Sequence, residues 1–89
     1  MSVFVWWPDG TNVSQVQLGE DCKTWRDLLH KVCKQNQWPT HNRGLYLCRK
    51  DLPLVVFRPN QGIDKAECQI CSLNGSHFLR HFIDEQWAK

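Results

Sequence analysis

Apolar and polar residues follow a two-residue period near the start of the chain. Residues 3–7 (VFVWW) are β-branched and aromatic, which is typical of a strand. Residues 8–11 (PDGT) predict a turn, because proline presets φ and glycine accepts a positive φ. Residues 13–18 (VSQVQL) then alternate between apolar and polar, so the first 18 residues predict a β-hairpin.

The period lengthens at residue 24. Thr24 and Asp27 have the spacing of a capping box, in which each end of the motif satisfies a free backbone N–H group. Apolar residues then recur at helical intervals, at Trp25, Leu28, Leu29 and Val32. This pattern predicts an amphipathic helix over residues 24–36, which Trp38-Pro39 ends.

The second half of the chain predicts three shorter strands and a final helix. Two apolar segments, residues 45–48 and 54–57, flank a tight turn at 49–51. Residues 66–73 predict the last strand, with Ala66, Cys68 and Ile70 facing inward. Ser76 is a candidate N-cap for a C-terminal helix over residues 76–88, whose apolar positions are Phe78, Leu79, Phe82, Ile83 and Trp87.

The predicted order is two strands, a helix, three strands and a helix. One long helix packed on a mixed sheet with an N-terminal hairpin is typical of the β-grasp, or ubiquitin-like, α+β fold. In that fold the first and last strands are parallel neighbours. An α+β sandwich of another topology is the alternative. We expect one domain over residues 1–89, with its core in 3–73 and a helical extension at 76–88.

Residues 3–18 and 24–36 (VFVWWPDGTNVSQVQL and TWRDLLHKVCKQN) resemble the start of a Ras-binding domain. The type is the one found in Raf kinases and in some regulators of G-protein signalling. The segments GLYLCRKDLPLVV and ECQICSL are similar to its later strands. The resemblance implies a partner, a GTP-loaded Ras-family small GTPase, bound when the second strand adds to the edge of the GTPase sheet. The implied site comprises Asn12, Val13, Ser14, Gln15, Val16 and Gln17, with Lys31 and Lys34 on the helix.

The second strand of this implied site carries no Arg or Lys, and Asn36 stands where the family has a basic residue near the helix end. An exposed ion pair contributes only about 0–1 kcal/mol. Main-chain hydrogen bonds and apolar contacts would therefore supply most of the binding.

The adjacent residues Trp6 and Trp7 should point to opposite faces of the first strand. If Val3, Val5 and Trp7 face the helix, then Phe4 and Trp6 face outward, and Tyr46 of the third strand joins them. One interpretation is an aromatic surface for a partner on the open face of the sheet. The other is that the C-terminal helix packs there and makes Trp6 part of a second core. A one-residue slip in register would exchange the two faces.

Cys68, Cys71, His77 and His81 offer ligand types that suit zinc, so a small zinc-stabilised module is an alternative. Five residues separate Cys71 from His77, whereas roughly 12 residues separate the cysteine pair from the histidine pair in a C2H2 zinc finger. If residues 66–73 form a strand, the side chains of Cys68 and Cys71 also point to opposite faces. We expect no metal and no other cofactor.

Composition and sequence motifs limit the classes of function that we expect. The net charge of +2 gives little reason to expect nucleic acid as a partner, and no apolar run of about 18 residues predicts a membrane span. No glycine-rich phosphate loop, nucleophile elbow or HExxH motif is present, so we expect no enzyme. The five cysteines and the lack of a signal peptide favour reduced thiols in the cytoplasm. We expect an intracellular protein-binding domain of a larger protein, monomeric when isolated.

Overall fold

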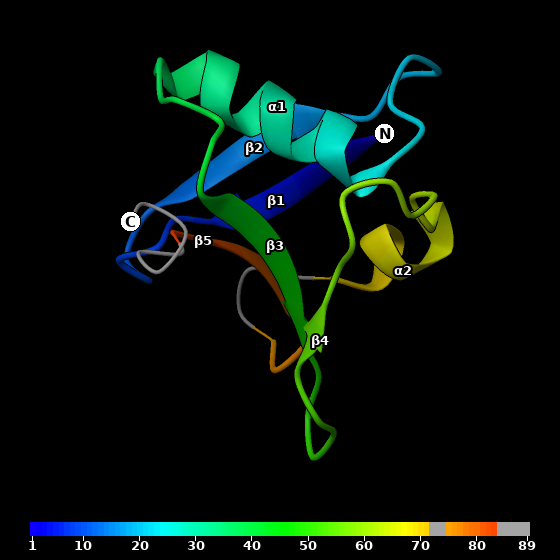
Figure 1. Cartoon of the computed structure of the whole chain (residues 1–89). Coiled ribbons are helices and arrows are strands. Elements are labelled where there is room, and N and C mark those ends of the chain that lie inside the picture. Colours follow the sequence, from blue (N-terminus) through cyan, green and yellow to red (C-terminus); the bar gives the residue numbers. More distant parts are fainter. Residues whose placement is uncertain (72–74, 84–89) are drawn as a thin grey trace.

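The computed structural model describes residues 1–71 and 75–83. The protein is a small α+β domain with a five-stranded mixed sheet and two helices (Figure 1). None of the described helices is long and apolar enough to cross a membrane. In chain order, the elements are β1 (Ser2–Trp6), β2 (Val13–Gln17), α1 (Trp25–Asn36), β3 (Arg43–Cys48), β4 (Val55–Val56), α2 (Lys65–Ile70) and β5 (Phe78–Ile83).

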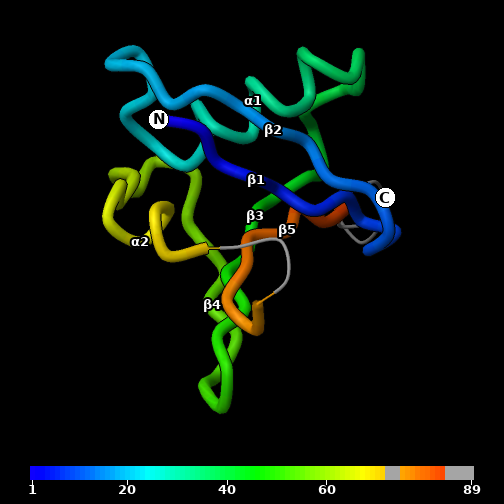
Figure 2. The backbone as a smooth tube through the Cα atoms, turned by 180° about the vertical axis from the view of Figure 1, so that it is seen from behind, coloured from blue at the N-terminus to red at the C-terminus, as the bar shows by residue number. Residues whose placement is uncertain are grey.

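The strands lie side by side in the order β2-β1-β5-β3-β4. β1 is antiparallel to β2, which confirms the predicted hairpin, and parallel to β5. β3 is antiparallel to both β5 and β4. Figure 2 shows β5 between β1 and β3, and the β3–β4 hairpin projecting away from the rest of the sheet. β2 and β4 are therefore the two edge strands.

The predicted helix is confirmed as α1. The Thr24 side chain accepts from the Asp27 N–H, and the Asp27 carboxylate accepts from the Thr24 N–H, which completes the capping box. Gln37 ends the helix in the left-handed conformation, with φ of 60°. Figure 1 shows α1 lying over one face of the sheet, and it contacts β2 and β3.

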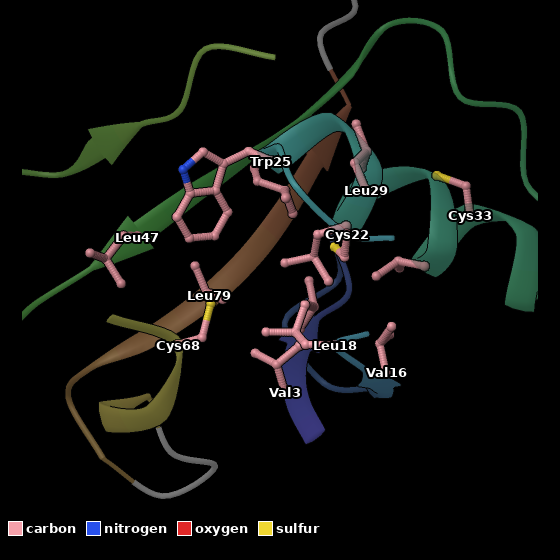
Figure 3. Close-up of a cluster of buried hydrophobic side chains, with 14 residues drawn as sticks. Val3, Val16, Leu18, Cys22, Trp25, Leu29, Cys33, Leu47, Cys68 and Leu79 are labelled. Carbon is pink, nitrogen blue, oxygen red and sulfur yellow. The ribbon is translucent and has the colours of Figure 1, made fainter. Parts of the chain in front are cut away.

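The core lies between that face of the sheet and the helices. Both helices contribute to one buried cluster, which Figure 3 shows. Val3 and Val5 are buried in it, as the alternation along β1 predicted. All five cysteines are free thiols. The cluster comprises Val3, Val5, Val16, Leu18, Cys22, Trp25, Leu28, Leu29, Val32, Cys33, Leu45, Leu47, Cys68 and Leu79.

The strand predicted for residues 66–73 is wrong where the structure describes it, because residues 65–70 form α2, and residues 72 and 73 lie outside the described residues. The Asp64 carboxylate caps this helix by accepting from the N–H groups of Ala66 and Glu67. Cys68 is the only buried residue of α2, and Ile70 is 59% exposed. The apolar spacing that resembled a strand therefore belongs to a short helix with one buried side chain.

The C-terminal helix predicted from Ser76 is also wrong where the structure describes it. Residues 78–83 form β5, in which Leu79 and His81 face the core. β5 is a central strand of the sheet and not part of a helical extension. Residues 84–88 of the predicted helix, including Trp87, lie outside the described residues. A parallel central pair exists as expected, but β5 takes the place of the predicted last strand.

Candidate functional site

The first candidate surface is the free edge of β2, where the predicted partner-binding strand lies. Ser14 and Val16 are buried, at 3% and 4% exposure, so their side chains belong to the interior. Gln15 and Gln17 are exposed and Val13 is half-buried. The predicted strand residues therefore divide into two sets, and only the second presents side chains to a partner.

The main-chain N–H and C=O groups of β2 also fall into two sets, those that bond to β1 and those that face away from it. At the two ends of the hairpin, the Trp7 N–H donates to the Asn12 carbonyl (2.8 Å) and the Leu18 N–H to the Met1 carbonyl (2.7 Å). In an antiparallel pair, successive residues alternate between bonding to the partner strand and facing away from it. Within the described residues no strand pairs with the outer edge of β2. Its outward-facing N–H and C=O groups belong to Val13, Gln15 and Gln17.

The turn before β2 is held by side chains. The Asp9 carboxylate accepts from the N–H groups of Thr11 (2.9 Å) and Asn12 (3.2 Å), and these bonds lower the pKa of Asp9 to about 2. The Asn12 amide also donates to Asp9, at 3.0 Å. Gly10 has φ of +73° and packs against the Arg80 guanidinium, which donates to the Pro8 carbonyl. Asn12 is exposed but serves this turn.

A polar contact joins β2 to α1 behind the edge. The Ser14 hydroxyl accepts from the Trp7 indole N–H and from the Asn36 side chain, both at 2.9 Å. Trp7 also packs edge-on against Trp38, with ring centroids 4.7 Å apart. Asn36 therefore joins the end of α1 to β2.

The two predicted helix lysines differ in their surroundings. Lys31 donates to the Gln17 carbonyl (3.2 Å) and to the Asp21 carboxylate (3.1 Å), so it already occupies one outward group of the β2 edge. Lys34 is exposed, and its side chain makes no hydrogen bond or ion pair with the described residues. Of the two predicted lysines, Lys34 therefore has the unpaired charge.

The second candidate surface is the face of the sheet opposite α1. Phe4 and Trp6 lie on it and are half-buried, as is Tyr46. The strand register places Trp6, Arg80 and Tyr46 in one row across β1, β5 and β3. Two rings that the sequence pattern assigned to a helix, Phe78 and Phe82, share this face. We call the five rings, Phe4, Trp6, Tyr46, Phe78 and Phe82, the aromatic face.

Two close contacts shape this face. The Phe82 ring lies over Gly44, where an added Cβ would meet the ring at 2.5 Å. Tyr46 and Phe82 have centroids 6.0 Å apart. A pocket of about 220 Å³ opens near the turn, lined by Trp6, Gly10, Gly75, Phe78 and Arg80. The alternation in β5 (Leu79 and His81 inward) was the signal in the sequence that could have revealed Phe78 and Phe82.

The four predicted zinc ligands do not converge. His77 pairs with the Glu67 carboxylate at 2.8 Å, and His81 is fully buried beside Arg43. Burial raises the pKa of the Cys68 thiol to about 12 and that of Cys71 to about 11, so both are neutral thiols at pH 7. The described part of the chain holds no cluster of three or more His, Cys, Asp or Glu that could bind a metal.

The comparisons with known proteins do not assign this chain to a family. No protein-family model matches this chain, and no curated protein sequence matches it significantly. The site must therefore be judged on its own geometry: an edge strand with free main-chain groups, and a sheet face with five aromatic rings.

Proposed function

We propose that this chain is a ubiquitin-like β-grasp domain that binds another protein and performs no catalysis. The support is the topology. A β1–β2 hairpin, a parallel β1–β5 pair in the middle of the sheet and one main helix over one face agree with the β-grasp arrangement. The first candidate partner is a GTP-loaded Ras-family GTPase, because residues 3–73 resemble Ras-binding domains.

The observation that carries the proposal is the free edge of β2. Val13, Gln15 and Gln17 direct main-chain donors and acceptors away from β1, and a partner strand can pair with them. The turn at Asp9 and the Ser14 contact hold this edge in an extended conformation before a partner arrives. A preformed edge lowers the entropy cost of association.

Charge contributes less than the main chain. Micromolar affinity needs about 8 kcal/mol, whereas an exposed ion pair gives about 0–1 kcal/mol. Lys31 is already bound to Gln17 and Asp21, so of the two predicted lysines Lys34 is the one available to an acidic partner. We expect Lys34→Glu to weaken binding and Lys31→Glu also to disturb the edge itself.

A proline substitution separates edge pairing from every other mode of binding. Gln15→Pro removes one outward N–H group and leaves the β1 pairing intact, because proline is tolerated on edge strands whose N–H faces solvent. Gln15→Ala is the matched control, since it removes the same side chain and keeps the N–H group. We expect Gln15→Pro to abolish binding of the GTP-loaded GTPase and Gln15→Ala to retain it.

The measurement is an amide NMR titration of the labelled domain with a Ras-family GTPase loaded with a GTP analogue or with GDP. Shifts of Val13, Gln15 and Gln17 with the GTP form alone would support the proposal. The absence of shifts with either form removes that GTPase as the partner.

The aromatic face supports a second mode of binding. Five partly exposed rings around Arg80 are typical of a surface that contacts a partner. In the same titration, shifts confined to Trp6, Tyr46 and Phe82 would assign binding to this face and exclude the β2 edge. Trp6→Ala should then weaken binding, whereas Gln15→Pro should not.

A further inference from the structure

A third surface lies apart from the β2 edge and the aromatic face. A pocket of about 280 Å³ opens between α1, the loop that follows it, the start of β3 and the segment after β4. It contains no residue of β2, and β3 lies three places from β2 in the sheet order. Neither proposed mode of protein binding uses it.

The residues that line the pocket supply positive charge and hydrogen-bond donors. Arg26 and His30 are four residues apart on α1 and so share a face of the helix, while His41 of the following loop and Arg43 of β3 also line the pocket. None of the lining residues is acidic. Among the described residues, neither arginine forms an ion pair.

Arg43 is held in place by neutral groups. Its Nη1 donates to His81 Nε2 at 3.0 Å, and its guanidinium lies 5.1 Å from the centroid of the Trp38 ring. Burial and the nearby Arg43 charge lower the pKa of His81 to about 4, so this histidine is neutral at pH 7. The contacts orient the guanidinium and leave its charge uncompensated.

The floor of the pocket is apolar and well packed. Trp25 is 2% exposed and stacks on Phe57, with ring centroids 3.7 Å apart and an interplanar angle of 11°. The Trp25 indole N–H has no acceptor in the described residues. In Figure 3 this nitrogen points away from Leu79 and Cys68 in the core.

The segment of residues 58–62, from which Pro59 lines the pocket, is attached to the start of α1. The Trp25 N–H donates to the Gln61 carbonyl and the Arg26 N–H to the Pro59 carbonyl, each at 3.1 Å. An antiparallel bridge between Thr24 and Gly62 adds to this attachment. The pocket is therefore preformed, as small-molecule sites usually are.

We propose that this pocket binds a phosphomonoester carried on a small apolar or aromatic body, with Arg26 and Arg43 holding the phosphoryl group. Two guanidinium groups, one from α1 and one from β3, suit the three oxygens and the nearly double charge of a phosphoryl group. The Trp25–Phe57 floor contacts the body of the ligand. The volume is slightly below the roughly 300 Å³ of the smallest typical ligand sites, which favours one phosphorylated group over a dinucleotide.

Phenyl phosphate is the first probe, with phenol and inorganic phosphate as controls. We expect phenyl phosphate to shift the Trp25 indole N–H and the Arg43 resonances in an NMR titration, and to bind more tightly than either control. If phenol binds as tightly as phenyl phosphate, the arginines do not hold the phosphoryl group. If inorganic phosphate binds as tightly as phenyl phosphate, the Trp25–Phe57 floor does not contact the ligand. Phosphotyrosine and adenosine monophosphate then distinguish two sources of the ester, and the proposal fails if neither binds more tightly than inorganic phosphate.

Arg26→Gln and Lys34→Gln form a matched pair, because both remove one exposed cation from α1 and only Arg26 lines the pocket. We expect the first to weaken phenyl phosphate binding by about tenfold or more and the second to leave it unchanged. An unchanged unfolding midpoint in urea verifies that each variant is folded. Equal weakening by both substitutions would show a general charge effect and refute the site.

Discussion

The stability of the contact between β2 and α1 should depend on the Ser14 hydroxyl. Ser14 is 3% exposed, and its Oγ accepts hydrogen bonds from two donors, the Trp7 indole N–H and the Asn36 side chain. Ser14→Ala keeps the strand residue nearly the same size but removes the shared acceptor. The Trp7 N–H then has no acceptor, whereas Asn36 still donates to the Val32 carbonyl at 2.8 Å.

The magnitude follows from this difference between the two donors. A buried donor left unsatisfied costs about 1–3 kcal/mol, and a lost hydrogen bond whose donor keeps another acceptor costs about 0.5–1.5 kcal/mol. Trp7 and Asn36 are half-buried, so water relieves part of both costs. We expect Ser14→Ala to lower the free energy of unfolding by about 2–3 kcal/mol.

Urea unfolding, followed by circular dichroism, measures this loss. The midpoint should fall with no change in the m value, which reports the surface exposed on unfolding. Gln15→Ala, one residue away and exposed, should stay within about 0.5 kcal/mol of the wild type. In a Trp7→Phe background, which keeps a ring but removes the donor, Ser14→Ala should cost clearly less. An equal cost in both backgrounds would refute the hydrogen-bond explanation.

Two further predictions concern the core side of β5 and its outer face. Burial first, and then the Arg43 charge, lower the pKa of His81 from 6.5 to about 4, so the unfolded chain binds this proton more readily than the folded one. The corresponding stability, about 3 kcal/mol, should be fully present above pH 6.5 and be lost as the pH falls toward 4. Urea unfolding across this range should show the loss, and His81→Gln should remove that part of the pH dependence. Gly44→Ala should destabilise the domain by about 1–3 kcal/mol, because the new Cβ meets the Phe82 ring at 2.5 Å. Gly62→Ala, whose nearest contact is at 3.9 Å, should be tolerated, and equal unfolding midpoints in urea for the two variants would contradict this reasoning.

Local signals in the sequence were sufficient for the first half of the fold. The Pro-Asp-Gly-Thr turn, the alternation in β2 and the Thr24–Asp27 capping box each act within a few residues, so they predict their elements without knowledge of the rest of the chain. The same alternation predicted that Val3 and Val5 face inward and that Phe4 and Trp6 lie on the opposite face. It also predicted the strand β2, whereas the expectation that this strand pairs with a partner through its edge came from the resemblance to Ras-binding domains.

The surfaces were only partly predictable. The sequence predicted Phe4, Trp6 and Tyr46 on the aromatic face. Phe78 and Phe82 also lie there, but their segment had been interpreted as a helix. The 280 Å³ pocket brings together Arg26, Arg43 and Phe57, which come from three separate elements or loops. No spacing along the chain indicates that such residues meet.

In the second half, tertiary structure decided which of two short segments became the strand. Residues 65–70 and 78–83 each contain apolar residues at spacings that fit a helix or a strand, because segments this short do not separate the two periods. Asp64 favours a helix in the first segment by capping its free N–H groups. The second segment bonds to β1 on one side and β3 on the other, with Leu79 and His81 in the core. A strand draws its hydrogen bonds from distant parts of the chain, so only the assembled sheet could determine that residues 78–83 belong at its centre.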